Sequence, residues 1–144
     1  MTRQNIVIAD ADAFIAIVNS NDSNNSKAVE VLERLQYLNA EVFFPVTAIS
    51  EAITSAQRKN SDPKLAKAMV EIAISGDINT LGVEPDIIME AAKLYNPIGS
   101  KQNTFFDAIV AAIAIKNNAL AVFSFDKWYK SQGLKLAEDL IEVS

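Results

Sequence analysis

Four acidic residues stand in unusually apolar parts of the sequence, and their side chains could do chemistry together. They are Asp10, Glu51, Asp107 and Asp126. Asp107 lies in the run 105–115, in which the other ten of the eleven residues are apolar. Burying an unpaired carboxylate is costly, so such a residue is normally neutralised, paired or bound to a metal ion. The setting of these four acids predicts a carboxylate site.

If the four carboxylates cluster, each raises the pKa of its neighbours, and a bound cation relieves the repulsion. Ligands that are all oxygen favour Mg²⁺ or Mn²⁺ over zinc. Such ions activate water at neutral pH and neutralise charge that develops on phosphoryl oxygens. The pattern therefore favours metal-assisted hydrolysis.

Composition narrows the chemistry further. The 144-residue chain has no histidine and no cysteine, which excludes the usual zinc ligands, disulfides and the Ser-His and Cys-His pairs. Its net charge of −5 argues against a broad nucleic-acid-coating surface, because such binding depends on lysine and arginine. An enzyme that holds one short stretch of RNA or DNA is still compatible with this charge.

The elements that must position the acids alternate along the chain. We expect strands at 5–9, 41–44, 78–83, 120–124 and, after Gly133, 134–137. We expect helices at 13–18, 27–38, 46–59, 63–75, 85–95, 104–117 and 126–130. This order indicates one α/β domain over residues 1–144, with a mostly parallel sheet covered on both faces. Ligands of such sheets bind beyond the carboxyl ends of the strands, where Asp10 and Asp126 stand.

Each acid also has an ordinary structural explanation. Thr104 and Asp107 fit a helix capping box, and Asp126 could cap the short helix that follows it. Asp10 could be a turn residue, and Glu51 could lie on a solvated helix face. Independent capping does not explain why all four acids have apolar surroundings.

Taken together, the four segments resemble the PIN-domain family of metal-dependent nucleases. The matching segments are 6–16, 45–51, 107–114 and 122–127, so the likeness spans nearly the whole chain. The resemblance implies a three-layer α/β/α sandwich that hydrolyses single-stranded or structured RNA. It also implies Mg²⁺ or Mn²⁺ bound by Asp10, Asp107 and Asp126, with Glu51 assisting.

Small members of this family resemble the toxin of a toxin–antitoxin pair, so a homodimer and a cognate antitoxin are implied partners. Ser124 fits the hydroxyl that usually precedes the last acid. Asp12 is a departure, because members usually carry Ser, Thr or Asn there. It is either an additional outer-sphere acid or a sign that the first part of the site is altered.

Candidates for RNA contacts are few. Arg58 lies seven residues after Glu51 on the same helical face, and Lys101 and Lys127 flank acids in sequence. Each could bind a phosphate or be a solvated surface charge. Trp128 and Tyr129 could stack on a base or pack in the core or a dimer interface.

Two other functions compete. Asp10 and Asp12 resemble the signature of haloacid-dehalogenase-type phosphatases, although Phe14 stands where that signature has Thr or Val. A catalytically inactive PIN-like module that binds RNA or protein is the other alternative. No signal peptide or membrane-spanning segment is visible, so we expect a cytoplasmic protein.

Overall fold

The computed structural model describes residues 5–141. Its centre is a four-stranded sheet, with β1 (Asn5–Ala9), β2 (Ala40–Pro45), β3 (Asn79–Leu81) and β4 (Ala121–Phe123). The strand order is β3-β2-β1-β4, and all neighbouring strands are parallel. The expected α/β class with a parallel sheet is confirmed.

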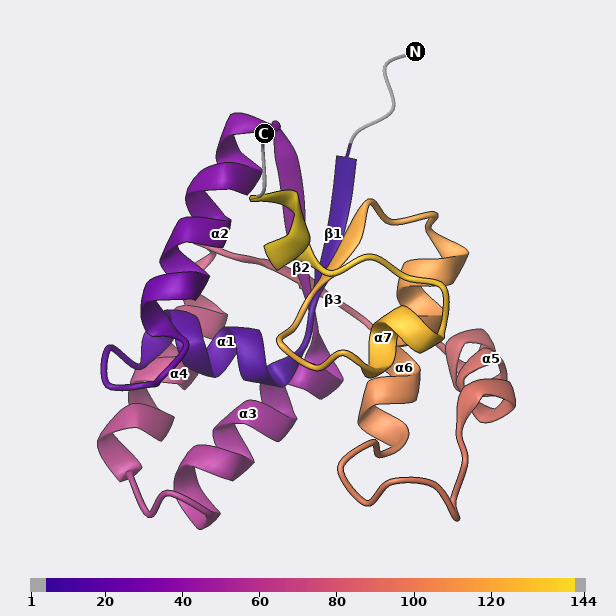
Figure 1. Ribbon diagram of the computed structural model, residues 1–144. Helices are drawn as coiled ribbons and strands as arrows, with labels where there is room; N and C mark the ends of the chain where they lie inside the picture. Colours follow the sequence, from indigo (N-terminus) through magenta and orange to yellow (C-terminus); the bar gives the residue numbers. More distant parts are fainter. Residues whose placement is uncertain (1–4, 142–144) are drawn as a thin grey trace.

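Helices cover both faces of the sheet, as the three-layer prediction requires (Figure 1). One face carries α1 (Ala11–Val18), α2 (Asn25–Tyr37), α3 (Val46–Arg58) and α4 (Pro63–Ser75). The other face carries α5 (Pro85–Leu94), α6 (Phe105–Lys116) and α7 (Trp128–Ser131). A 3₁₀ helix, η1 (Ala137–Leu140), packs beside α2.

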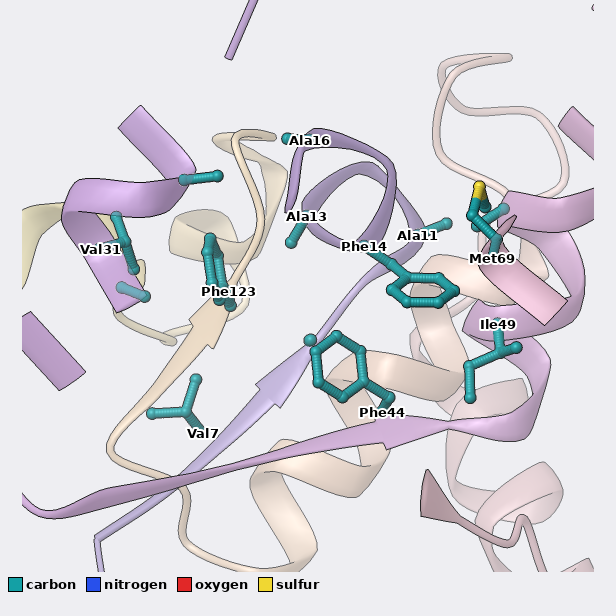
Figure 2. Packing of buried hydrophobic residues seen from close by; sticks show 14 of the residues in the cluster. Val7, Ala11, Ala13, Phe14, Ala16, Val31, Phe44, Ile49, Met69 and Phe123 are labelled. Atoms are coloured by element: carbon teal, nitrogen blue, oxygen red, sulfur yellow. The ribbon is translucent and has the colours of Figure 1, made fainter. Parts of the chain in front are cut away.

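The core consists of two clusters of buried residues, one on each face of the sheet, and the side chains of β1 alternate between them. Val7 and Ala9 face the cluster that includes Phe14 and Phe44, whose rings lie 5.4 Å apart (Figure 2). Ile8 points to the opposite face and belongs to the cluster around α6. Because successive side chains of a strand point to opposite faces, this one strand helps to fill both cores.

Helix α6 is unusual, because every residue from Asp107 to Ala114 is buried. An apolar helix of this kind must be enclosed, and here α5, α3 and the sheet surround it. None of the helices within residues 5–141 is long and apolar enough to cross a membrane.

Some local signals act as the sequence predicts. The Asp62 carboxylate accepts a hydrogen bond from the Leu65 backbone N–H at 3.0 Å and so caps α4, with Pro63 as the first helical residue. Gly76 ends the same helix with φ of 86°, a left-handed conformation that suits glycine.

The predicted last strand, 134–137, is wrong. Only an isolated bridge between Val122 and Leu136 forms there, because the chain turns into η1 at Ala137. The helix expected from Asp126 begins only at Trp128, since the Asp126 side chain accepts a hydrogen bond from the Trp128 N–H and holds a turn. Strand β3 is shorter than expected because it pairs only with the last three residues of β2.

The strand order places the end of β1 beside the end of β4. Successive connections run outwards from β1 to β2 and β3, and the chain then returns to pair β4 on the other side of β1. Such a reversal opens a crevice at the carboxyl ends of the two strands, which is where α/β proteins bind ligands.

Candidate metal and nucleic-acid site

Three carboxylates meet at this crevice. Asp10 directly follows β1, Glu51 lies in the second turn of α3, and Asp107 lies in the first turn of α6. One oxygen from each lies within 4.8 Å of the others. Residues 41 to 97 positions apart in sequence are thus brought together by the sheet and its two flanking layers.

The three acids line a cavity of about 500 Å³. Asp126 and Asp12 line it too, so all four predicted acids and the predicted supporting acid face one space. Asp126 is not one of the three residues whose oxygens converge. Hydroxyl, amide, aromatic and basic side chains complete the wall: Ser50, Thr54, Ser55, Arg58, Lys59, Gln102 and Phe106.

Asp10 is buried, with 4% of its surface exposed, and both of its carboxylate oxygens accept hydrogen bonds. One carboxylate oxygen accepts a hydrogen bond from the Ala11 N–H at 2.7 Å. The other accepts a short hydrogen bond from the Tyr129 hydroxyl. Burial raises the pKa of Asp10 well above its usual value, and the nearby charges of Asp12 and Asp107 raise it further.

Asp107 has two roles at once. Its Oδ2 accepts a hydrogen bond from the Thr104 backbone N–H at 3.0 Å, which is the capping contact expected from the sequence. Its Oδ1 lies 3.5 Å from the Tyr129 hydroxyl, and one oxygen of the same carboxylate belongs to the converging set. Capping and membership of the cluster are therefore compatible, although the sequence presented them as alternatives.

Glu51 is half-buried and has the clearest shift. Burial, then the charges of Asp107 and Asp12, raise its pKa from 4.5 to about 7, while Lys59 opposes the shift. Burial is also the main cause of the raised pKa of Asp107. These shifts share one origin, because negative groups are desolvated together. Perturbed carboxylates in a cleft are typical of functional sites.

Asp126 is positioned by its neighbours. Its Oδ2 accepts a hydrogen bond from the Asn103 side chain at 2.8 Å, and its backbone N–H donates to the Ser124 hydroxyl at 3.1 Å. Ser124 is buried, and its hydroxyl donates to Asp12 at 2.9 Å. Ser124 thus contacts the backbone of Asp126 rather than its carboxylate.

The Asp12 side chain lies in α1 and forms hydrogen bonds with the connection after β4, and it is not one of the three converging carboxylates. Its Oδ2 accepts hydrogen bonds from the Ser124 hydroxyl and, at 2.8 Å, from the Phe125 N–H, while Oδ1 accepts from the Ala13 N–H at 2.9 Å. The phosphatase alternative requires Asp12 as a general acid for a leaving group. Its engagement in three contacts within the chain argues against that role.

The three predicted basic residues differ in their placement. Arg58 lines the cavity, whereas Lys101 and Lys127 are exposed and lie outside its lining. Lys59 lines the cavity as well, and sequence reasoning missed it although it adjoins Arg58.

Two other residues were missed, Asn103 and the Tyr129 hydroxyl. Tyr129 is fully buried, so it packs in the core and cannot stack on a base. The hydroxyl of a buried tyrosine normally forms a hydrogen bond, and this rule was the one signal in the sequence that Tyr129 could contact the site.

The donor set fits a hard divalent ion. Oxygen ligands bound at about 2 Å lie at most about 4 Å apart, and the three carboxylate oxygens here, all within 4.8 Å of one another, need only small side-chain movements to share one ion. Mg²⁺ keeps several water ligands, so three carboxylates beside an open cavity are sufficient. With neither histidine nor cysteine in the chain, softer metals lack their preferred ligands.

Comparisons with known proteins agree with this geometry. A family model of the PIN domain matches residues 7–132. The sarcin–ricin-loop-cleaving toxin VapC20 of Mycobacterium tuberculosis is similar in structure, with a TM-score of 0.73, 20% identity, and coverage of 89% of this chain and 95% of that chain.

VapBC2 from Rickettsia felis, in a structure bound to a DNA fragment from its promoter, has a TM-score of 0.62 and 15% identity. That match covers 91% of this chain and 96% of the other. No curated protein gives a significant sequence match.

Proposed function

The chain belongs to the PIN domain family, and on that premise we propose that it is a metal-dependent ribonuclease. The observation that carries the proposal is the convergence of Asp10, Glu51 and Asp107 oxygens within 4.8 Å at a cavity of about 500 Å³. A cavity of this size accommodates a short stretch of nucleic acid rather than a duplex, which agrees with the negative net charge.

We assign metal binding to Asp10, Glu51 and Asp107, and Mg²⁺ or Mn²⁺ is the ion that suits them. When bound, the ion supplies an activated water and neutralises charge on the phosphodiester. Asp126, with its carboxylate held by Asn103, lines the same cavity and assists there. Asp12 and Ser124 hold the segment that presents Asp126.

We also propose that the protein is the toxin of a toxin–antitoxin pair. Support comes from its likeness to VapC20, which is a toxin, and to VapBC2. A cognate antitoxin and a second copy of the chain are the proposed partners. The likeness covers nearly all of both matched chains.

The test is cleavage of a labelled RNA by purified protein. We expect cleavage with Mg²⁺ or Mn²⁺, loss of cleavage in EDTA, and no rescue by Zn²⁺. Asp10→Asn should abolish cleavage, because it removes a charged oxygen from the cluster while keeping the side-chain shape. Asp77→Asn, at an exposed site outside the cavity, should cleave like the wild type.

Two outcomes would refute the proposal. Hydrolysis of a small phosphomonoester without cleavage of RNA would favour the phosphatase alternative. RNA binding with no cleavage in the presence of every metal tested would favour an inactive binding module.

A further inference from the structure

The cavity has two chemically different ends. Asp10, Glu51 and Asp107 form the acidic end, while Arg58 and Lys59 lie at the carboxyl-terminal end of α3. Glu51 and Arg58 are seven residues apart, so they share one helical face and are separated by about 10 Å along the axis. At that spacing Arg58 can hold a phosphate that neighbours the one at the carboxylates.

The two cations are available for an external partner. Both are exposed, and within residues 5–141 neither forms an ion pair. Four other lysines are paired with acids in that part of the chain: Lys27, Lys93, Lys116 and Lys130. Thr54 and Ser55 line the cavity on the same helix between Glu51 and Arg58, and Ser50 lines it one residue before Glu51.

Phe106 supplies an apolar surface at this cavity. It is 41% exposed, whereas each of the eight residues after it in α6 is buried. Its position immediately before Asp107 places an aromatic ring beside the acidic end. Its ring is partly exposed at a cavity lined by polar and charged side chains, and aromatic faces of this kind stack on unpaired bases.

We propose that this cavity contains a subsite for a nucleotide that flanks the scissile phosphate of single-stranded RNA. Phe106 stacks on its base, and Arg58 and Lys59 bind its phosphate. The proposal rests on the ribonuclease function proposed above and extends it to the form of the substrate. A base must be free of its pairing partner to stack on Phe106, so the subsite selects single strands.

We expect the protein to bind only a short length of RNA, for an electrostatic reason. The chain carries 13 Lys and Arg against 18 Asp and Glu, so the surface as a whole does not attract RNA. Among the described residues that line the cavity, Arg58 and Lys59 are the cations that offset the acidic cluster. The site therefore holds the cleaved linkage and its near neighbours rather than a long stretch.

The first experiment measures binding separately from cleavage. The Asp10→Asn protein is titrated into a fluorescein-labelled hexanucleotide RNA and followed by fluorescence anisotropy. Adding Phe106→Ala should weaken binding by about 5- to 150-fold, the range measured for base stacking on aromatic side chains. Adding Arg58→Ala and Lys59→Ala together should weaken binding and lower the dependence of log Kd on log salt by about 0.7 for each phosphate that the protein no longer neutralises.

Matched controls are two exposed residues outside the cavity. Lys67→Ala removes a cation from α4, and Tyr37→Leu removes an exposed aromatic ring from α2. Neither should change Kd by more than twofold. Phe106→Tyr keeps an aromatic face and should bind like the parent protein. Phe106→Leu keeps an apolar side chain without that face and should still bind weakly, which a purely structural role of Phe106 would not predict. Circular dichroism of each variant checks that it is folded.

The second experiment uses the protein with native Asp10 and RNAs from two to six nucleotides long. We expect the Arg58 and Lys59 substitutions to raise KM for the longer RNAs with kcat nearly unchanged, and to change KM least for the dinucleotide.

If wild-type protein cleaves RNA but these substitutions change neither Kd nor KM, the subsite is refuted and the nuclease stands. If RNA binds through Phe106 and Arg58 but is never cleaved, the subsite stands and the nuclease falls. An absence of RNA binding refutes the subsite.

Discussion

Glu51 shows most clearly how one residue links the fold to its chemistry. Helix α3 places it among buried alanine and isoleucine side chains, and it receives no hydrogen bond from the described residues to compensate for lost water. The pKa of about 7 follows mainly from this burial and next from the charge of Asp107. A carboxylate left in this state favours a metal ion or a proton as its partner.

We expect Glu51→Gln to stabilise the metal-free protein at pH 8. An acid whose folded pKa is raised binds more protons in the native than in the unfolded state, so stability falls as pH rises from about 4.5 to about 7. Removing the charge should make the free energy of unfolding less dependent on pH across that window. The measurement is urea unfolding in EDTA at pH 5, 6, 7 and 8.

The exposed acid Glu71 on α4 provides the control, because Glu71→Gln removes the same charge from outside the cavity. That variant should follow the wild-type pH profile. A Glu51→Gln protein that is less stable than the wild type at pH 8 would show that the carboxylate is already compensated in the native state.

At the residue scale, the sequence predicted the acids but not all of their partners. Asp107 was recognisable because it interrupts an apolar run, a conflict between residue type and burial that local pattern reveals. Asn103 and the Tyr129 hydroxyl carry no such conflict. Asn103 contacts Asp126 in the β4–α7 connection, and Tyr129 of α7 contacts Asp10. Both contacts depend on how the connection and α7 pack, which is set by the whole fold.

At the scale of elements, the alternation of strands and helices was predictable because each strand is a short apolar run and each helix has its own period or cap. The prediction failed near the C-terminus, where 134–137 has the composition of a strand but forms one bridge to Val122. A strand at 134–137 would have to form hydrogen bonds with β4, which is only three residues long. The β-propensity of a segment carries no information about the length of the neighbouring strand.

Tyr129 connects three elements through one hydroxyl. It comes from α7, donates to Asp10 after β1 and lies 3.5 Å from the Asp107 Oδ1 on α6. We expect Tyr129→Phe to fold, because only the hydroxyl is lost from a buried ring. It should be destabilised by about 1.5–3 kcal/mol, as expected for a hydrogen bond to a charged group, and should bind Mg²⁺ more weakly because Asp10 is less constrained.

Urea unfolding in EDTA and isothermal titration with Mg²⁺ test both effects of Tyr129→Phe. Tyr37→Phe is the control, since Tyr37 is 75% exposed on α2. Equal stability and equal Mg²⁺ affinity in wild type and Tyr129→Phe would show that the hydroxyl does not position the carboxylates.

At the scale of the whole molecule, the site opposes the stability of the fold that builds it. The sheet and both helical layers are required to bring Asp10, Glu51 and Asp107 together, and their pKa values are raised as a result. Without metal, these charges oppose folding at neutral pH. A metal ion that binds only the native state reverses this effect.

The variant that tests this opposition is Asp107→Asn, which we expect to be more stable than the wild type in EDTA at pH 8 and inactive. The asparagine oxygen can still accept the hydrogen bond from the Thr104 N–H that caps α6, so the cap survives while the charge is lost. At a hundredfold excess over its dissociation constant, Mg²⁺ should stabilise the wild type by about 2.7 kcal/mol and the variant by less. Thermal melts with EDTA and with Mg²⁺ measure both differences, and Asp77→Asn should respond to metal like the wild type. If Asp107→Asn is strongly destabilised in EDTA and gains as much from Mg²⁺ as the wild type does, the Asp107 carboxylate serves only the helix cap.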